Sequence, residues 1–145
     1  DDTAEIIKAL QAKFPSITTP RREDICYATT NRQEAVKVMG KRADLFLVIG
    51  AETSSNSKRL VEVAKREGAR QSELVASAEH VNWDWFDGVE TLGITAGASA
   101  PEDLVQGLIA ACRARFDITV EEITTAEESV VFRLPKILKK DKIPA

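Results

Sequence analysis

One stretch of the sequence decides the fold: Asp44-Leu45-Phe46-Leu47-Val48-Ile49. Its last five residues are all apolar and lack the alternation of a half-exposed strand, which is typical of a parallel strand buried on both faces. Gly50 ends this strand, and the hydroxyl-rich loop 53–57 leads into a helix that carries Leu60 and Ala64. The sequence therefore predicts a strand, a loop and a helix in immediate succession.

The same order of elements recurs on both sides of this unit. Residues 92–95 predict a strand, and the helix that follows has Ser99 and Glu102 at the spacing of a capping box. Upstream, the short apolar stretch 24–28 precedes a helix with capping-box spacing at 30 and 33. Each helix is thus expected to begin directly after a polar loop.

Three further short strands are predicted, at 74–76, 118–120 and 130–132. Strands that alternate with helices form a parallel sheet whose faces the helices cover. The predicted fold class is therefore α/β, a three-layer lobe with a mostly parallel sheet flanked by helices.

Composition fits a folded protein and excludes several classes of function. The chain has 145 residues, of which 43% are hydrophobic and 30% charged, and its net charge is −3. This balance offers no basic surface for nucleic acid or for a membrane. No apolar run approaches the roughly 20 residues that span a bilayer. Because two cysteines cannot form a disulfide scaffold at this length, we expect a cytoplasmic location, or the stroma of a plastid or similar organelle.

Hydroxyl and amide side chains gather where the predicted helices begin. They are Thr29, Thr30 and Asn31 in the first unit, Ser54, Ser55 and Asn56 in the second, and Ser99 in the third. In a parallel sheet these loops all leave the carboxyl ends of the strands. Unpaired amides and the positive end of the helix dipole attract anions there. The pattern therefore predicts an edge of the sheet that binds phosphate.

Helix capping is the competing explanation for each of these loops. Ser, Thr and Asn are the residues that any helix start prefers, and a capping box alone would explain Ser99 with Glu102. The run of polar side chains at 54–57 exceeds what one cap needs. It matches no Walker-type phosphate loop, because no Gly-Lys-Ser/Thr ends it.

Two cysteines and one histidine are present. Cys26 lies shortly before a predicted helix start, where a thiolate is favoured and can bind metal or attack a substrate. A buried apolar role is the alternative for this residue. Cys112 continues the apolar face of its helix and is predicted to lie in the core. His80 is predicted to be a surface imidazole.

Three motifs occur together and in order along the chain. They are Cys26-Tyr27-Ala28-Thr29-Thr30-Asn31-Arg32-Gln33, Ser54-Ser55-Asn56-Ser57-Lys58-Arg59-Leu60 and Gly93-Ile94-Thr95-Ala96-Gly97-Ala98-Ser99-Ala100-Pro101. In these motifs the chain resembles the 4-hydroxy-3-methylbut-2-enyl diphosphate reductases of the IspH/LytB family. Phe132-Arg133-Leu134-Pro135 is similar to the carboxyl end of that family. The resemblance covers essentially the whole chain, but only the later part of the family's length.

The resemblance implies an oxidoreductase of the non-mevalonate isoprenoid pathway. The family holds a 4Fe–4S cluster on three cysteines at the centre of three α/β lobes, and one open iron binds the allylic hydroxyl of the diphosphate substrate. Two electrons and protons release water and give isopentenyl and dimethylallyl diphosphate. A ferredoxin- or flavodoxin-type protein is the implied electron donor.

By this likeness Cys26 is the third cysteine of the cluster, while Ser54, Ser55, Asn56 and Ser99 hold the diphosphate. The family's other two cluster cysteines, its pocket histidines and its proton-relaying glutamate have no counterpart in this chain. No catalytic residue is therefore expected here. We expect the chain to be the carboxyl-terminal portion of the reductase, without a cluster and inactive by itself.

Three segments are expected on the same basis. Residues 1–19 form a trailing helix of a preceding lobe, and its apolar face lacks a partner. Residues 20–116 form the α/β lobe that carries Cys26, the Ser54–Asn56 loop and Ser99. Residues 117–145 form strands and a tail that would pack on the missing lobe.

Two other classes of function remain open. One is a free-standing α/β module that binds a phosphorylated metabolite without redox chemistry. The other is a thiol enzyme with Cys26 as its nucleophile. Neither alternative explains the occurrence of three linked motifs in one chain.

Overall fold

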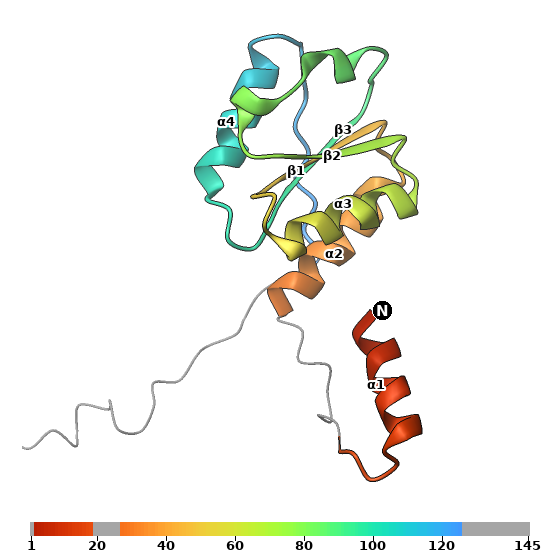
Figure 1. Ribbon diagram of the computed structural model, residues 1–145. Coiled ribbons are helices and arrows are strands. Elements are labelled where there is room, and N and C mark those ends of the chain that lie inside the picture. The colour runs from red at the N-terminus through yellow and green to blue at the C-terminus, as the bar shows by residue number, and fades with distance from the viewer. Residues whose placement is uncertain (1, 19–26, 126–145) are drawn as a thin grey trace, which may run out of the picture.

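A computed structural model describes residues 2–18 and 27–125 (Figure 1). Its sheet has three parallel strands in the order β2-β1-β3, with β1 at Leu45–Ile49, β2 at Gln71–Val75 and β3 at Leu92–Ala96. Ile49 lies opposite both Val75 and Ala96, so the three strands end level with one another. The predicted α/β class with a parallel sheet is confirmed.

Helices cover both faces of this sheet (Figure 1). One face carries α2 (Tyr27–Gly40) and α3 (Ser55–Glu67). The other carries α4 (Glu102–Arg113) with two short 3-10 helices, η1 (Ala78–His80) and η2 (Trp83–Phe86). No helix in the described ranges combines the length and the apolar character needed to cross a membrane.

Strand β1 holds the three layers together because both of its faces are buried. All five of its side chains are 0% exposed. Phe46 and Val48 pack with Leu60 and Val63 under α2 and α3. The remaining side chains of β1 pack with Leu108 and other residues on the side of α4. This two-sided burial is the reason that the strand has no polar alternation in its sequence.

The two predicted capping boxes are wrong. Helix α2 already begins at Tyr27, which places Thr30 and Gln33 inside the helix. Helix α4 begins at Glu102, and its N-cap is Pro101, with no side-chain cap hydrogen bond. A Ser or Thr followed three residues later by Glu or Gln is a frequent combination, and it marks a helix start only when the first residue is itself extended.

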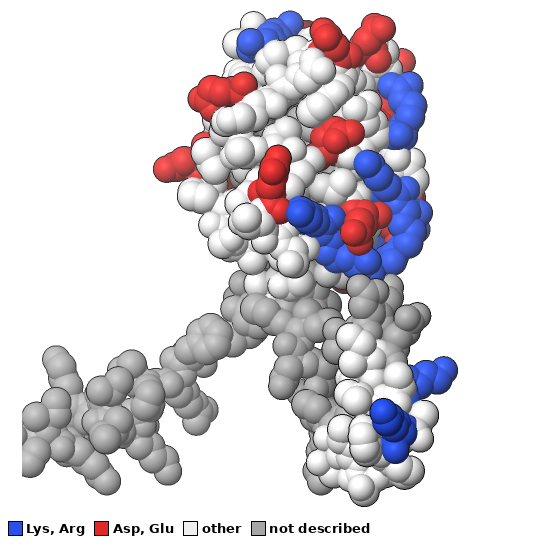
Figure 2. Space-filling view, in the orientation of Figure 1, with Lys and Arg blue, Asp and Glu red and all other residues white. Residues whose placement is uncertain are grey.

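Helix α1 (Asp2–Lys13), the first element of the described residues, exposes apolar side chains. Ile6 is 60% exposed and Phe14, directly after α1, is 51% exposed, and Figure 2 shows uncharged surface of this helix around its blue lysines. The expected exposure of these apolar side chains is confirmed, and the assignment of residues 1–19 to a preceding lobe stays a prediction. Residues 118–120, where a strand was predicted, belong to no strand, and the strand predicted at 130–132 lies outside the described residues.

Close packing between β3 and β1 generates a test of the fold. A Cβ atom added at Gly93 would overlap the ring of Phe46, which is fully buried, so the ring or the backbone would have to shift. We expect Gly93→Ala to lower the free energy of unfolding by about 1–3 kcal/mol, the usual cost of overpacking. Urea denaturation measures this change.

Gly107→Ala is the matched control. Gly107 lies within α4 and a Cβ there would meet nothing within 4 Å. Because alanine favours a helix more than glycine does, this substitution should raise the free energy of unfolding by about 1 kcal/mol. Equal effects of the two substitutions would contradict the packing described for β3.

Candidate functional site

The carboxyl ends of the three strands meet at one edge of the sheet, and backbone hydrogen bonds fix them there. The Gly50 N–H donates to the Val75 carbonyl at 3.0 Å, and the Gly97 N–H donates to the Ile49 carbonyl at 2.8 Å. The ladder thus continues one residue beyond β1 and β3. The loops that follow these strands therefore start from fixed positions side by side.

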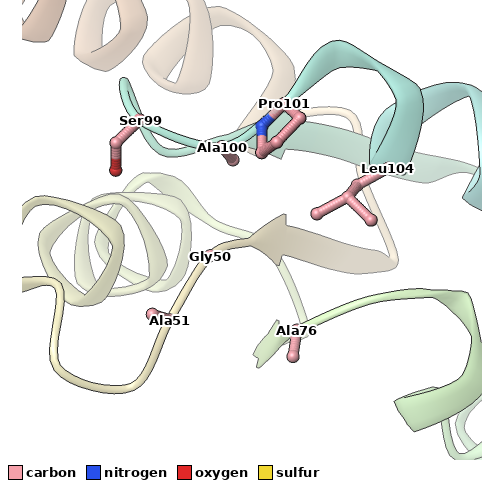
Figure 3. Close-up of a pocket in the computed structure, with 7 residues that line it drawn as sticks. All are labelled: Gly50, Ala51, Ala76, Ser99, Ala100, Pro101 and Leu104. Carbon is pink, nitrogen blue, oxygen red and sulfur yellow. The ribbon is translucent and has the colours of Figure 1, made fainter.

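A cavity of about 240 Å³ opens at this edge (Figure 3). Its lining comes from the residues that follow all three strands: Gly50, Ala51, Ala76, Ser99, Ala100, Pro101 and Leu104. Ser99 supplies the one hydroxyl of this lining, and Figure 3 shows it directed toward the side on which Gly50 and Ala51 lie. The cavity is smaller than the roughly 300–1,000 Å³ of most ligand pockets, so it fits part of a ligand.

At the start of α3, the hydroxyl proton of Ser54 has no acceptor among the described residues. Ser54 is the N-cap, and its Oγ accepts hydrogen bonds from the Ser57 N–H at 3.2 Å and from the Ser57 hydroxyl at 3.0 Å. A hydroxyl has two lone pairs and one proton. Because both lone pairs of Ser54 are used inside the loop, its proton remains available to donate to an anion. Capping and ligand binding are therefore compatible at this residue.

Ser57 joins the two loops physically. Its side chain is buried, and a Cβ atom at either Gly50 or Gly97 would overlap its Oγ. The hydroxyl therefore fills a gap between the loop after β1 and the loop after β3, and only glycine leaves it room on both sides. Sequence reasoning gave Ser57 no role of its own. A glycine directly after each of the two strands was the signal that could have found it.

Asn56 carries a buried amide without a partner. Both Nδ2 and Oδ1 are inaccessible to solvent, and neither has a hydrogen-bond partner among the described residues. A buried polar group in this state costs about 1–3 kcal/mol. Ser55, its neighbour, is exposed at the same helix start. The first turn of α3 therefore offers both unpaired and accessible hydrogen-bonding groups.

Capping does not explain Ser99. Pro101 occupies the N-cap of α4, and Ser99 lies two residues before it with an exposed side chain. The structure places Ser99 on the cavity wall, while Ser54, Ser55 and Asn56 lie at the start of α3 and are absent from that lining. Because Ser57 packs against Gly97, the loop that carries Ser54, Ser55 and Asn56 is a neighbour of the loop that carries Ser99.

The reactive side chains are not gathered at this edge in the described part of the chain. Cys26 and its loop fall outside the described residues. Cys112 lies in the core as predicted, and burial raises the pKa of its thiol. His80 is exposed as predicted, with Nδ1 2.9 Å from the Ser77 hydroxyl.

A 4Fe–4S cluster held by cysteine thiolates does not fit this chain alone. The sequence has two cysteines, and one of them is Cys112 in the core. Among the described residues, no group of three or more His, Cys, Asp or Glu side chains could hold a metal ion. Such a cluster needs more thiolates than these residues supply.

Comparison with known proteins decides the family. A family model described as "LytB protein" matches residues 1–113, which include Cys26, the Ser54–Asn56 loop and Ser99. This chain belongs to the LytB family. The first 113 residues of this LytB chain thus contain all the residues that the sequence singled out for binding.

Relatives of this LytB chain are named as 4-hydroxy-3-methylbut-2-enyl diphosphate reductases. The protein of Hyphomonas neptunium is 66% identical over 138 residues, which cover 95% of this chain and 44% of the relative. That of Ruegeria pomeroyi is 54% identical over 140 residues, with 97% and 44% covered. The chain therefore spans less than half the length of these relatives.

A solved structure shows the same fold. The E-1-hydroxy-2-methyl-but-2-enyl-4-diphosphate reductase from Plasmodium falciparum superposes with a TM-score of 0.80 at 32% sequence identity. The match covers 94% of this LytB chain and 43% of that chain. The fold of this chain is therefore that of one part of a larger reductase structure.

The packing of Ser57 against Gly50 and Gly97 predicts how alanine at either glycine changes the stability of this LytB chain. Neither Gly50 nor Gly97 has a positive φ, so added volume is the main effect of alanine at these sites. Gly97→Ala should cost about 1–3 kcal/mol of unfolding free energy by overpacking against the Ser57 Oγ. Adding Ser57→Ala should recover most of that loss, because the Ser57 Cβ is an ordinary 3.6 Å from the new atom.

Gly50→Ala provides the control for this double-mutant cycle. Its new Cβ would lie 2.7 Å from the Ser57 Cβ, an overlap that Ser57→Ala does not remove. Urea denaturation of the single and double variants measures the coupling. Rescue of both glycine variants, or of neither, would show that Ser57 does not fill the gap as described.

Proposed function

We propose that this LytB chain supplies the diphosphate-binding edge of a 4-hydroxy-3-methylbut-2-enyl diphosphate reductase. The observation that carries the proposal is the meeting of two polar loops at the carboxyl ends of β1 and β3. One begins α3 with the free proton of Ser54, and the other places Ser99 on a cavity wall. Anions bind at such edges in open parallel sheets because helix starts carry unpaired amides.

Each proposed ligand residue contributes a hydrogen bond and no charge. Ser54, Ser55 and Ser99 donate hydroxyl protons to phosphate oxygens. Asn56 would donate through Nδ2 once its side chain turns outward, because this amide is shielded from solvent and lacks a partner among the described residues. A charged acceptor strengthens each of these bonds relative to one between neutral groups. The relatives are named as reductases of an allylic diphosphate, which supports the choice of that ligand.

The cluster and the electrons would come from outside the described residues. By the family resemblance, Cys26 supplies one thiolate to a 4Fe–4S cluster, and the further thiolates belong to parts of a reductase beyond this chain. A ferredoxin- or flavodoxin-type donor is part of the same proposal. The segments 1–19, 20–116 and 117–145 would then be, in order, a helix of a preceding lobe, the diphosphate-binding lobe and a tail against the missing lobe. The 145-residue chain alone should not reduce the substrate.

The test uses a chimera. The matching segment of the Hyphomonas neptunium relative is replaced by this chain, which is 66% identical to it. With dithionite as reductant, the chimera should reduce 4-hydroxy-3-methylbut-2-enyl diphosphate, and the isolated chain should not. Ser99→Ala in the chimera should raise KM about tenfold or more, because a hydrogen bond to a charged group is lost.

Thr91→Ala is the control for Ser99→Ala. It removes an exposed hydroxyl at the opposite end of β3, next to Leu92. KM should stay unchanged in this variant. A folded chimera without activity would contradict the proposed function, as would equal KM values in the two variants. Turnover by the isolated chain would contradict its dependence on the missing part and favour a thiol enzyme or another complete active site.

A further inference from the structure

Arg32 is a partly buried cation at the edge that carries the proposed site. It lies in the second turn of α2, and its Nη1 donates to the carbonyl of Ala96, the last residue of β3, at 3.2 Å. This hydrogen bond joins residues 64 positions apart in the sequence. Sequence reasoning assigned no role to Arg32, although it belongs to the first of the three motifs.

The carbonyl that Arg32 binds lies on the open side of β3. The Gly97 N–H points to β1, where it donates to Ile49. Successive residues of a strand turn their polar groups to opposite sides, so the Ala96 carbonyl points away from β1. β3 is an edge strand of the described sheet and has no strand on that side. Arg32 thus donates a hydrogen bond to the Ala96 carbonyl, at the residue where β3 ends and the Ser99 loop begins.

Arg32 differs from two ion-paired basic residues that follow it in the sequence. Lys37 on the same helix pairs with Glu34 at 2.6 Å, and Arg42 pairs with Glu121 at 2.9 Å. Among the described residues, no carboxylate pairs with Arg32 and its buried Nε has no hydrogen-bond partner. Keeping the Nε–H of a cation from water without a hydrogen-bond partner is costly. A role in holding the neighbouring loop accounts for its presence at this edge.

We propose that Arg32 is a positioning residue for the diphosphate site, which rests on the function proposed above. Its bond to Ala96 fixes the end of β3, and through Gly97 it fixes the loop that places Ser99 beside the cavity. The positive charge also lies at the edge where the anion would bind. Because one N–H donor makes the bond, lysine can replace arginine there, whereas methionine cannot.

Amide hydrogen exchange in the 145-residue chain tests the positioning role directly. In Arg32→Met, exchange at the Gly97 N–H should quicken about tenfold, the effect of losing one hydrogen bond to a charged group. Exchange in β1, at Val48, should stay unchanged, which separates this effect from general destabilisation. Arg32→Lys should restore the slow exchange at Gly97. Arg32→Gln, a milder substitution, is measured in parallel and should lie between the methionine and lysine variants.

Inorganic pyrophosphate binding, measured by calorimetry, connects the loop to the site. Affinity should fall about tenfold in Arg32→Met and recover in Arg32→Lys, as expected when one charged hydrogen bond is lost and regained. Lys37→Met removes the same charge from the same helix without touching β3, and its affinity should match that of the unchanged chain.

The possible failures are distinguishable. Unchanged exchange at Gly97 in the methionine variant, or equal losses of affinity in Arg32→Met and Lys37→Met, would overturn the role of Arg32. Absence of pyrophosphate binding by the unchanged chain, with the exchange effects as expected, would count against the diphosphate site itself and leave the bond from Arg32 to Ala96 as a brace of the fold.

Discussion

A single buried hydroxyl, that of Ser57, sets how closely two loops approach at the carboxyl edge of the sheet. It fills the gap between Gly50 and Gly97, and it also donates to Ser54. Protein interiors are packed too closely to absorb even one added methyl group without a shift. The start of α3 and the start of the Ser99 loop are therefore held side by side because the Ser57 side chain fills the space between them.

The ability of this edge to bind an anion depends on which of its hydrogen-bond donors lack a partner. Ser54 uses its lone pairs within the loop and keeps a proton, Asn56 holds an unpaired amide, and Arg32 brings a positive charge from the opposite side of β3. Each of these groups has a hydrogen-bond donor that no described residue accepts from. Together they match the needs of an anion with many acceptor oxygens. Family membership and a reductase of the same fold support the proposal that this anion is a diphosphate.

Local patterns in the sequence predicted the layers of the fold but not its tertiary contacts. The apolar run of β1 predicted a strand buried on both faces, and the loop after it was correctly expected to lead into a helix, which is α3. Capping-box spacing misplaced the starts of α2 and α4, because the same residue pattern also occurs within helices. The roles of Ser57 and Arg32 depend on partners 40 and 64 residues away, which no short-range pattern reveals. Cys26, predicted as a metal ligand, lies outside the described residues, and its role stays a prediction.

Titration of the ¹⁵N-labelled chain with pyrophosphate, followed by NMR, would map the anion onto the sheet most directly. The two polar loops should respond together, with chemical-shift changes at the amides of Ser55, Ser57 and Ser99. Amides at the opposite edge, such as that of Thr91, which donates to the Asp44 carboxylate at 2.9 Å, should not move. Shifts confined to one loop, or spread equally over both edges, would contradict a single diphosphate site built from the starts of α3 and α4.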